Sequence, residues 1–71
     1  MFPLSLARTG EKLIIRKIKA EQEMKTRFQE LGFCEGSPIT IVNVERGNLI
    51  VKTKGSSYAI DRDFAQTIFV S

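Results

Sequence analysis

The feature that most constrains this chain is an apolar alternation that changes its buried face partway along a strand-like run. Leu13 and Ile15 lie on one face of this run, which covers residues 12–20. Ile18, in the same run, falls on the opposite parity. Because successive side chains of a strand point to opposite faces, the change requires a bulge or a sharp bend, which we expect near residues 16–17. Small barrels use such bends at their corners, so the pattern favours a β-barrel.

The second half of the chain behaves in the same way and is predicted to be β structure from residue 37 onward. Ile39 and Ile41 share one face, and the apolar alternation then changes parity, which predicts a second bend near residues 42–43. A Gly-Asn pair at residues 47–48 predicts a two-residue hairpin turn that sets Val44 opposite Val51. The other predicted elements are a turn at 55–57, a short strand at 58–60, a tight turn at 61–65 and a closing strand at 66–70 that buries Ile68 and Val70.

Between these β segments the period changes to that of an α-helix, at residues 21–31. The stripe predicted to face the core consists of Ala20, Met24, Phe28 and Leu31. Gly32 is predicted to end the helix as a left-handed residue, and Phe33 to follow it in a Schellman ending.

The length of 71 residues fits one domain, which we expect to span residues 1–71. The predicted fold class is mostly β: a small SH3-like barrel of about five strands, with one short α-helix (about residues 21–31) inserted after the first strand. The first nine residues are predicted to be a leading segment whose leucines pack onto the barrel.

Histidine is absent from the chain, and Cys34 is its one cysteine. Histidine is the usual base at neutral pH and the commonest ligand of zinc, copper and iron, so Ser-His or Cys-His catalysis and His-containing metal motifs are excluded. The chain also lacks a second cysteine for an internal disulfide and a Gly-x-x-x-x-Gly-Lys phosphate loop. We therefore expect a protein that is not an enzyme, with no catalytic, metal or nucleotide site and no cofactor.

Charges of both signs are interspersed, with 11 Lys and Arg against 8 Asp and Glu, a net charge of +3. A dedicated nucleic-acid module usually concentrates its positive charge further. No apolar run exceeds three residues, so we expect neither a membrane span nor a signal peptide. Because small secreted chains usually need disulfides, these features predict a cytoplasmic protein that is not inserted in a membrane.

Several short motifs resemble those of one known family. ELGF at residues 30–33 ends the helix, EGSPI at residues 35–39 opens a strand, and Gly10 precedes the first strand. The closing segments, YAI at 58–60 and IFV at 68–70, fit the same pattern. Over the whole chain these features resemble the FeoA family, small cytoplasmic partners of the FeoB ferrous iron transporter. The resemblance implies an SH3-like accessory protein of ferrous iron uptake that docks on the cytoplasmic part of a FeoB-type transporter, the part that bears its GTP-binding domain.

An RNA- or ribosome-associated SH3-like module is the alternative function. It depends on a single basic face formed by Arg16, Lys17, Lys19, Lys52 and Lys54, with Tyr58 as a stacking platform. Such binding weakens steeply with salt, which separates this alternative from the transporter partner. A DNA partner is not expected: iron-dependent repressors contain a similar unit, but this chain has no room for their DNA-binding parts.

The partner-binding surface is predicted on the helix, the feature that most distinguishes this chain from a bare five-stranded barrel. With one helix face packed on the core, the residues expected to face outward are Lys25, Arg27 and Gln29, with Phe33 and Cys34 at the helix end. An exposed aromatic residue beside basic residues is a composition that interfaces favour. The other interpretation of this face is a solvated surface with no partner.

Overall fold

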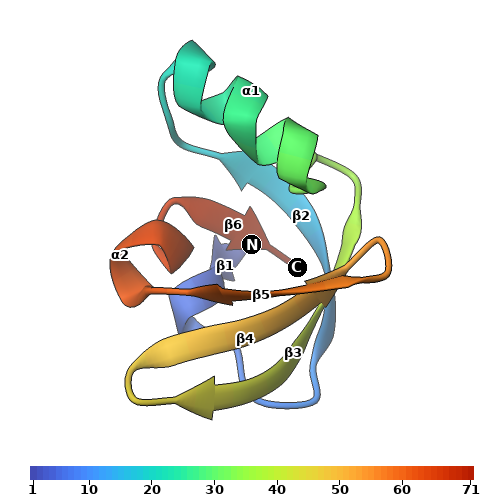
Figure 1. The fold of residues 1–71 in the computed structure, drawn as a ribbon, viewed down its shortest axis with the longest axis vertical. Helices are drawn as coiled ribbons and strands as arrows, with labels where there is room; N and C mark the ends of the chain where they lie inside the picture. Colours follow the sequence, from blue (N-terminus) through green and yellow to red (C-terminus); the bar gives the residue numbers. More distant parts are fainter.

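Six strands and one longer α-helix dominate the structure, a computed structural model that describes all residues, 1–71. In chain order the elements are β1 (Phe2–Pro3), the 3-10 helix η1 (Leu4–Leu6), β2 (Lys12–Ile18), α1 (Gln22–Leu31), β3 (Pro38–Glu45), β4 (Asn48–Thr53), β5 (Ser56–Ile60), α2 (Arg62–Ala65) and β6 (Ile68–Val70). The strands form one antiparallel sheet in the order β1-β6-β2-β3-β4-β5, which curls around the core (Figure 1). The prediction of a mostly β fold with a helix after the first long strand is confirmed. The number of strands is six rather than five, because the two-residue β1 has no alternation to detect.

Both predicted bends are present as irregularities in strand pairing. The register of β2 against β6 shifts between Ile15 and Lys17, and that of β3 against β4 shifts between Ile41 and Asn43. The first bend divides β2 between two neighbours, because residues 12–14 pair with β3 and residues 15–18 pair with β6. The bends therefore turn the sheet around its own interior, as the changes of parity predicted.

The interior of the curled sheet holds a single apolar core. Its buried side chains are Leu4, Ala7, Leu13, Ile15, Ile18, Phe28, Phe33, Ile39, Ile41, Leu49, Val51, Ile60, Ala65, Ile68 and Val70. The expectation for the leading segment is right for Leu4, which is fully buried, and wrong for Leu6, which is 68% exposed.

The two tight hairpins turn one residue earlier than predicted. Residues 46–47 form the first turn and residues 54–55 the second, and in each the non-glycine residue and the glycine both have positive φ. Positive φ at both central positions is the type I′ geometry, whose twist matches that of the flanking strands.

This one-residue shift changes the cross-strand partners of β3 and β4. Val44 lies opposite Leu49, and Val51 lies opposite Ile41, so the predicted pairing of Val44 with Val51 is wrong. The observed register puts Ile41 and Val51 together in the core, where both are fully buried. Because the turn position sets the register, the observed turn is the one that allows both side chains of this pair to be buried.

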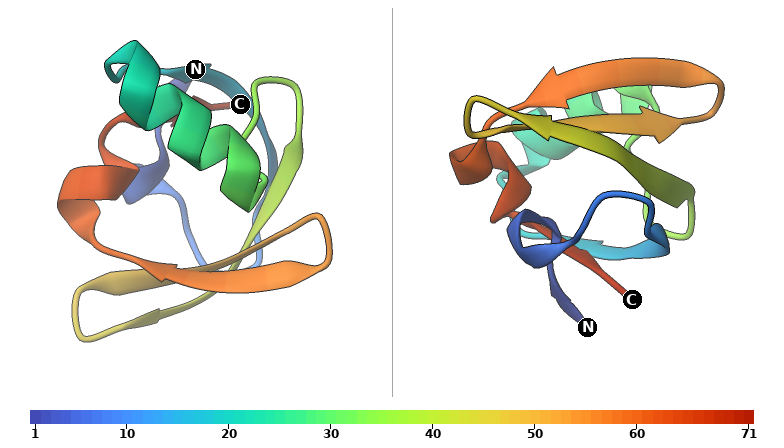
Figure 2. Two further views of the ribbon diagram at one scale, coloured as in Figure 1. Left: turned by 45° about the horizontal axis from the view of Figure 1, so that its top comes forward. Right: turned by 90° about the horizontal axis from the view of Figure 1, so that it is seen from below.

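Helix α1 is found where it was predicted, with Glu21 as the residue before its first turn. Of the stripe predicted to be buried, however, only Phe28 is in the core, while Met24 is 49% and Leu31 is 46% exposed. The physical reason is visible in Figures 1 and 2: α1 stands at one end of the curled sheet instead of lying flat across it. Few turns of the helix therefore come within reach of the core.

The end of α1 has the predicted Schellman geometry. Gly32 has φ +102°, the Gly32 N–H donates to the Gln29 carbonyl at 3.0 Å, and the Phe33 N–H donates to the Phe28 carbonyl at 2.8 Å. These bonds satisfy carbonyl groups that the helix end would leave unpaired, and they turn the chain back toward the barrel.

The segment predicted as a tight turn at residues 61–65 contains the short helix α2. The Asp61 carboxylate caps it by accepting a hydrogen bond from the Phe64 N–H at 2.7 Å. The closing strand is correspondingly shorter than predicted, and it buries Ile68 and Val70 as expected.

Candidate functional site

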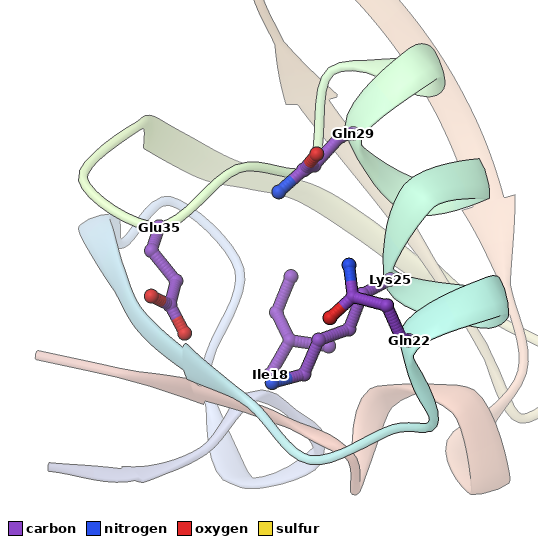
Figure 3. A pocket seen from close by; sticks show the side chains of 5 residues that line it. All are labelled: Ile18, Gln22, Lys25, Gln29 and Glu35. Carbon is purple, nitrogen blue, oxygen red and sulfur yellow. The ribbon is translucent and has the colours of Figure 1, made fainter.

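Two of the residues predicted to contact a partner lie together at a hollow beside α1. Lys25 and Gln29 border a hollow of about 190 Å³ between the helix and the barrel (Figure 3). Gln22 borders it from the first turn of the helix, Ile18 from the end of β2, and Glu35 from the loop that follows α1. Gln22, Lys25 and Gln29 recur at helical spacing, so the sequence contained a signal for this polar face.

The chemistry of this hollow suits contacts with a polypeptide. Its polar groups are two amides, one ammonium and one carboxylate, arranged around one aliphatic side chain. Amides both donate and accept hydrogen bonds, and the two charged groups are of opposite sign. The hollow is too small for most ligands, since ligand pockets usually measure ~300–1,000 Å³.

Phe33 was predicted to be exposed at the helix end, and this prediction is wrong. Its side chain is 1% exposed, with ring centroids 5.2 Å from Tyr58 and 5.7 Å from Phe64. The left-handed residue Gly32 reverses the chain, so the residue after it points back into the core. Phe33 is therefore a core residue and does not belong to a surface that a partner contacts.

The other two predicted residues do not line this hollow: Arg27 borders a separate small hollow on another side of α1, with Glu21, Glu23 and Met24. Arg27 is exposed on α1. Cys34 is half-buried, with its Sγ 3.8 Å from the Gln29 carbonyl oxygen and 3.8 Å from Lys54 Nζ. Four of the five predicted residues are thus exposed or half-buried, but Arg27 lies on a different side of α1 from Lys25 and Gln29.

The cations of the RNA alternative come from separate strands, and that alternative stays a prediction. The cations of β2 and those of β4 are separated by β3 in the sheet. Tyr58 is half-buried, its hydroxyl donates to the Leu31 carbonyl at 2.6 Å, and its ring packs against Phe33. A side chain held in this way is a poor platform for stacking with a base.

A second, larger hollow was not predicted, because it forms between segments that are far apart in the chain. It lies between α1 and α2 and measures about 580 Å³. Met24 and Phe28 border it from α1 and Phe64 from α2. The sequence interpretation had placed Met24 in the core and gave Phe64 no role.

A further question for the structure is whether any cluster of side chains could bind a metal ion. No group of three or more His, Cys, Asp or Glu side chains is placed to hold a metal ion. The absence of a metal site stays a prediction for titration.

No helix of the structure combines the length and the apolar composition needed to cross a membrane.

A family model and a relative of similar sequence identify one family. The model of the FeoA domain matches residues 2–71. A protein of Methanocaldococcus jannaschii named Fe(2+) transport protein A is 37% identical over 70 residues, which span 99% of this chain and 85% of that protein.

Solved structures of the same family have the same fold. An iron uptake regulatory protein, FeoA, superposes with a TM-score of 0.88 at 24% identity, over 99% of this chain and 93% of that one. The FeoA of Stenotrophomonas maltophilia, solved with zinc and described as a prokaryotic SH3 domain protein, gives a TM-score of 0.85 at 19% identity, over 100% and 91% of the two chains. These likenesses identify the curled sheet as a small SH3-like fold, as predicted. Together with the match of the family model along almost the whole chain, they show that this protein belongs to the FeoA family.

Proposed function

We propose that this chain is a small, non-enzymatic cytoplasmic accessory protein of ferrous iron uptake, which docks on the GTPase-bearing cytoplasmic part of a FeoB-type transporter. The observation that carries the proposal is the match to the FeoA domain over residues 2–71. The name of the M. jannaschii relative, a ferrous iron transport protein, supports the same process. The chain has no phosphate-binding loop of its own, so GTP chemistry belongs to the partner.

We further propose that the docking surface is the outward side of α1 and the turn after it. Its members are Lys25, Arg27, Gln29 and Cys34, with Gln22 and Glu35 completing the hollow of Figure 3. The support is the position of α1 at one end of the curled sheet and the exposure of all its residues except Lys25 and Phe28. Lys25 and Arg27 lie on different sides of α1, so each would pair with a separate acidic group of the partner.

Charge reversal of the two cations tests this surface. Lys25→Glu combined with Arg27→Glu should cost no more than ~1 kcal/mol of folding free energy, because neither side chain is in the core. The same variant should lose co-purification with the transporter and should fail to restore iron uptake in a deletion strain.

A matched control is available on the sheet. Lys12→Glu combined with Lys52→Glu makes the same change of net charge at two exposed positions that line neither hollow. This control should retain transporter binding and uptake. A folded Lys25→Glu/Arg27→Glu variant with normal uptake would refute the assignment of the surface.

A further inference from the structure

The larger hollow, between α1 and α2, is an apolar groove with an aromatic floor. The rings of Phe28 and Phe64 are stacked there, with centroids 4.3 Å apart and planes inclined by 18°. Ala20 and Met24 add aliphatic surface beside them. Unlike the polar hollow of Figure 3, this groove is lined mainly by apolar atoms, and at about 580 Å³ it falls within the usual size of ligand pockets.

Met24 is the unusual member of this groove. Its side chain is 49% exposed, although Phe28 and Phe64 line the same groove. Methionine has a flexible, polarisable side chain that adapts to varied partners, and proteins use it at surfaces that bind apolar segments. About half of its apolar surface is therefore available to a partner.

The rim of the groove is acidic, in contrast to the rest of the protein. Three acidic residues line it, Glu21, Asp61 and Asp63, against one basic residue, Lys19, and the Asp61 carboxylate also caps α2. The Lys19 ammonium lies 4.9 Å from the centre of the Phe69 ring, which is outside the groove. A chain with a net charge of +3 thus surrounds its largest apolar groove with negative charge.

We propose that this groove binds a short protein segment that carries an apolar anchor side chain flanked by Lys or Arg. The anchor would lie on the Phe28–Phe64 stack beside Met24, and its basic neighbours would face the carboxylates of the rim. The groove is open rather than enclosed, so it suits a side chain of a continuing polypeptide better than a small molecule that must be surrounded. The identity of the partner as the transporter rests on the proposed function, whereas the chemistry of the segment follows from the groove itself.

The experiment is selection of binding segments from a random displayed-peptide library on the purified full-length protein. Enriched peptides should share a Leu, Phe or Met next to Lys or Arg. Titrated into ¹⁵N-labelled protein, a synthetic copy should shift the amide signals of Met24, Phe28 and Phe64. Exchange of its basic residues for Glu should weaken binding at least about tenfold, equivalent to ~1.4 kcal/mol.

Two variants of α1 distinguish binding in the groove from binding elsewhere on the helix. Met24→Glu places a carboxylate in the groove, whereas Leu31→Glu makes the same change at a similarly exposed apolar position outside it. Met24→Glu should weaken the selected peptide at least about tenfold, and Leu31→Glu should leave it unchanged. Peptides enriched in acidic residues, a lack of enrichment, or equal effects of the two variants would overturn the proposal.

The outcome is independent of the proposed function, since peptide binding is measured without the transporter. If peptides fail to bind while the Lys25→Glu/Arg27→Glu variant loses the transporter, the groove proposal fails and the proposed function stands. If peptides bind as expected while Met24→Glu still co-purifies with the transporter, the groove proposal stands and its partner is a different protein.

Discussion

Replacement of Phe28 by alanine tests how α1 is held on the barrel. Phe28 is the one side chain of this helix in the core, at 8% exposure, and it stacks on Phe64. At the end of the helix, the Tyr58 hydroxyl also donates a hydrogen bond to the Leu31 carbonyl. The variant therefore removes the main apolar attachment of α1.

The expected cost follows from what Phe28 contacts. Burial of a Phe side chain contributes ~1.5–3 kcal/mol, and a stacked aromatic pair adds ~0.5–1.5 kcal/mol. Core Phe→Ala changes typically cost ~3–5 kcal/mol, in part because they leave a cavity. Phe28 borders the open groove, so water can fill part of the space, and we expect a loss of about 2–4 kcal/mol. Since a small domain has ~5 kcal/mol of stability in total, the variant should be marginally folded.

Urea unfolding followed by circular dichroism measures this loss as a lower midpoint at an unchanged m-value. Met24→Ala is the matched control: it truncates a half-exposed apolar residue of the same helix and should cost less than ~1 kcal/mol. Hydrogen exchange in the Phe28→Ala variant should accelerate most in residues 22–31. A midpoint within error of the wild type, or an equal loss in Met24→Ala, would refute the assignment of Phe28 as the anchor.

Two further predictions follow from the helix end and from the ligand inventory. Gly32→Ala should cost ~1–2 kcal/mol in the same unfolding assay, because φ is +102° and the added Cβ meets Lys54 Cδ at an ordinary 3.7 Å, so the cost is backbone strain rather than a clash. Gly32→Asn should cost less, since asparagine tolerates the left-handed region, and equal costs for both variants would contradict this explanation. Anaerobic titration calorimetry with Fe²⁺ should detect no stoichiometric site of micromolar affinity, because the chain has no histidine and a solitary cysteine. Retention of a stoichiometric amount of metal through dialysis would contradict this prediction.

Local signals in the sequence were enough to predict the secondary-structure elements and to indicate the family. The changes of parity in residues 12–20 and 39–44 predicted both bends, because the alternation of a strand is a property of consecutive residues. The helix and its left-handed end at Gly32 were predicted for the same reason, since period and capping act within a few residues. The motifs at residues 30–39 lie on these elements, so the resemblance to the FeoA family needed no tertiary information.

The site was only partly accessible to this reasoning. Gln22, Lys25 and Gln29 share a helical face, so a polar surface on α1 was predictable. Phe33 was misplaced, because a residue that follows a left-handed turn is directed by the turn and by what lies beneath it, not by the helical period. The groove between α1 and α2 brings together Phe28 and Phe64, which β3, β4 and β5 separate along the chain, so no local pattern links the two residues.

By itself, then, the sequence determined what each segment is: bent strands, one capped helix, a chain without histidine and a member of a recognisable family. The tertiary structure decided which face of each segment is buried. Because α1 stands at the end of the curled sheet, Phe28 is its buried residue while Met24 and Leu31 stay exposed. The turn at residues 46–47 likewise accompanies the β3–β4 pairing that buries Ile41 with Val51. Burial depends on contacts between residues distant in the chain, and periodicity in a sequence specifies the faces of a segment without specifying which of them meets the core.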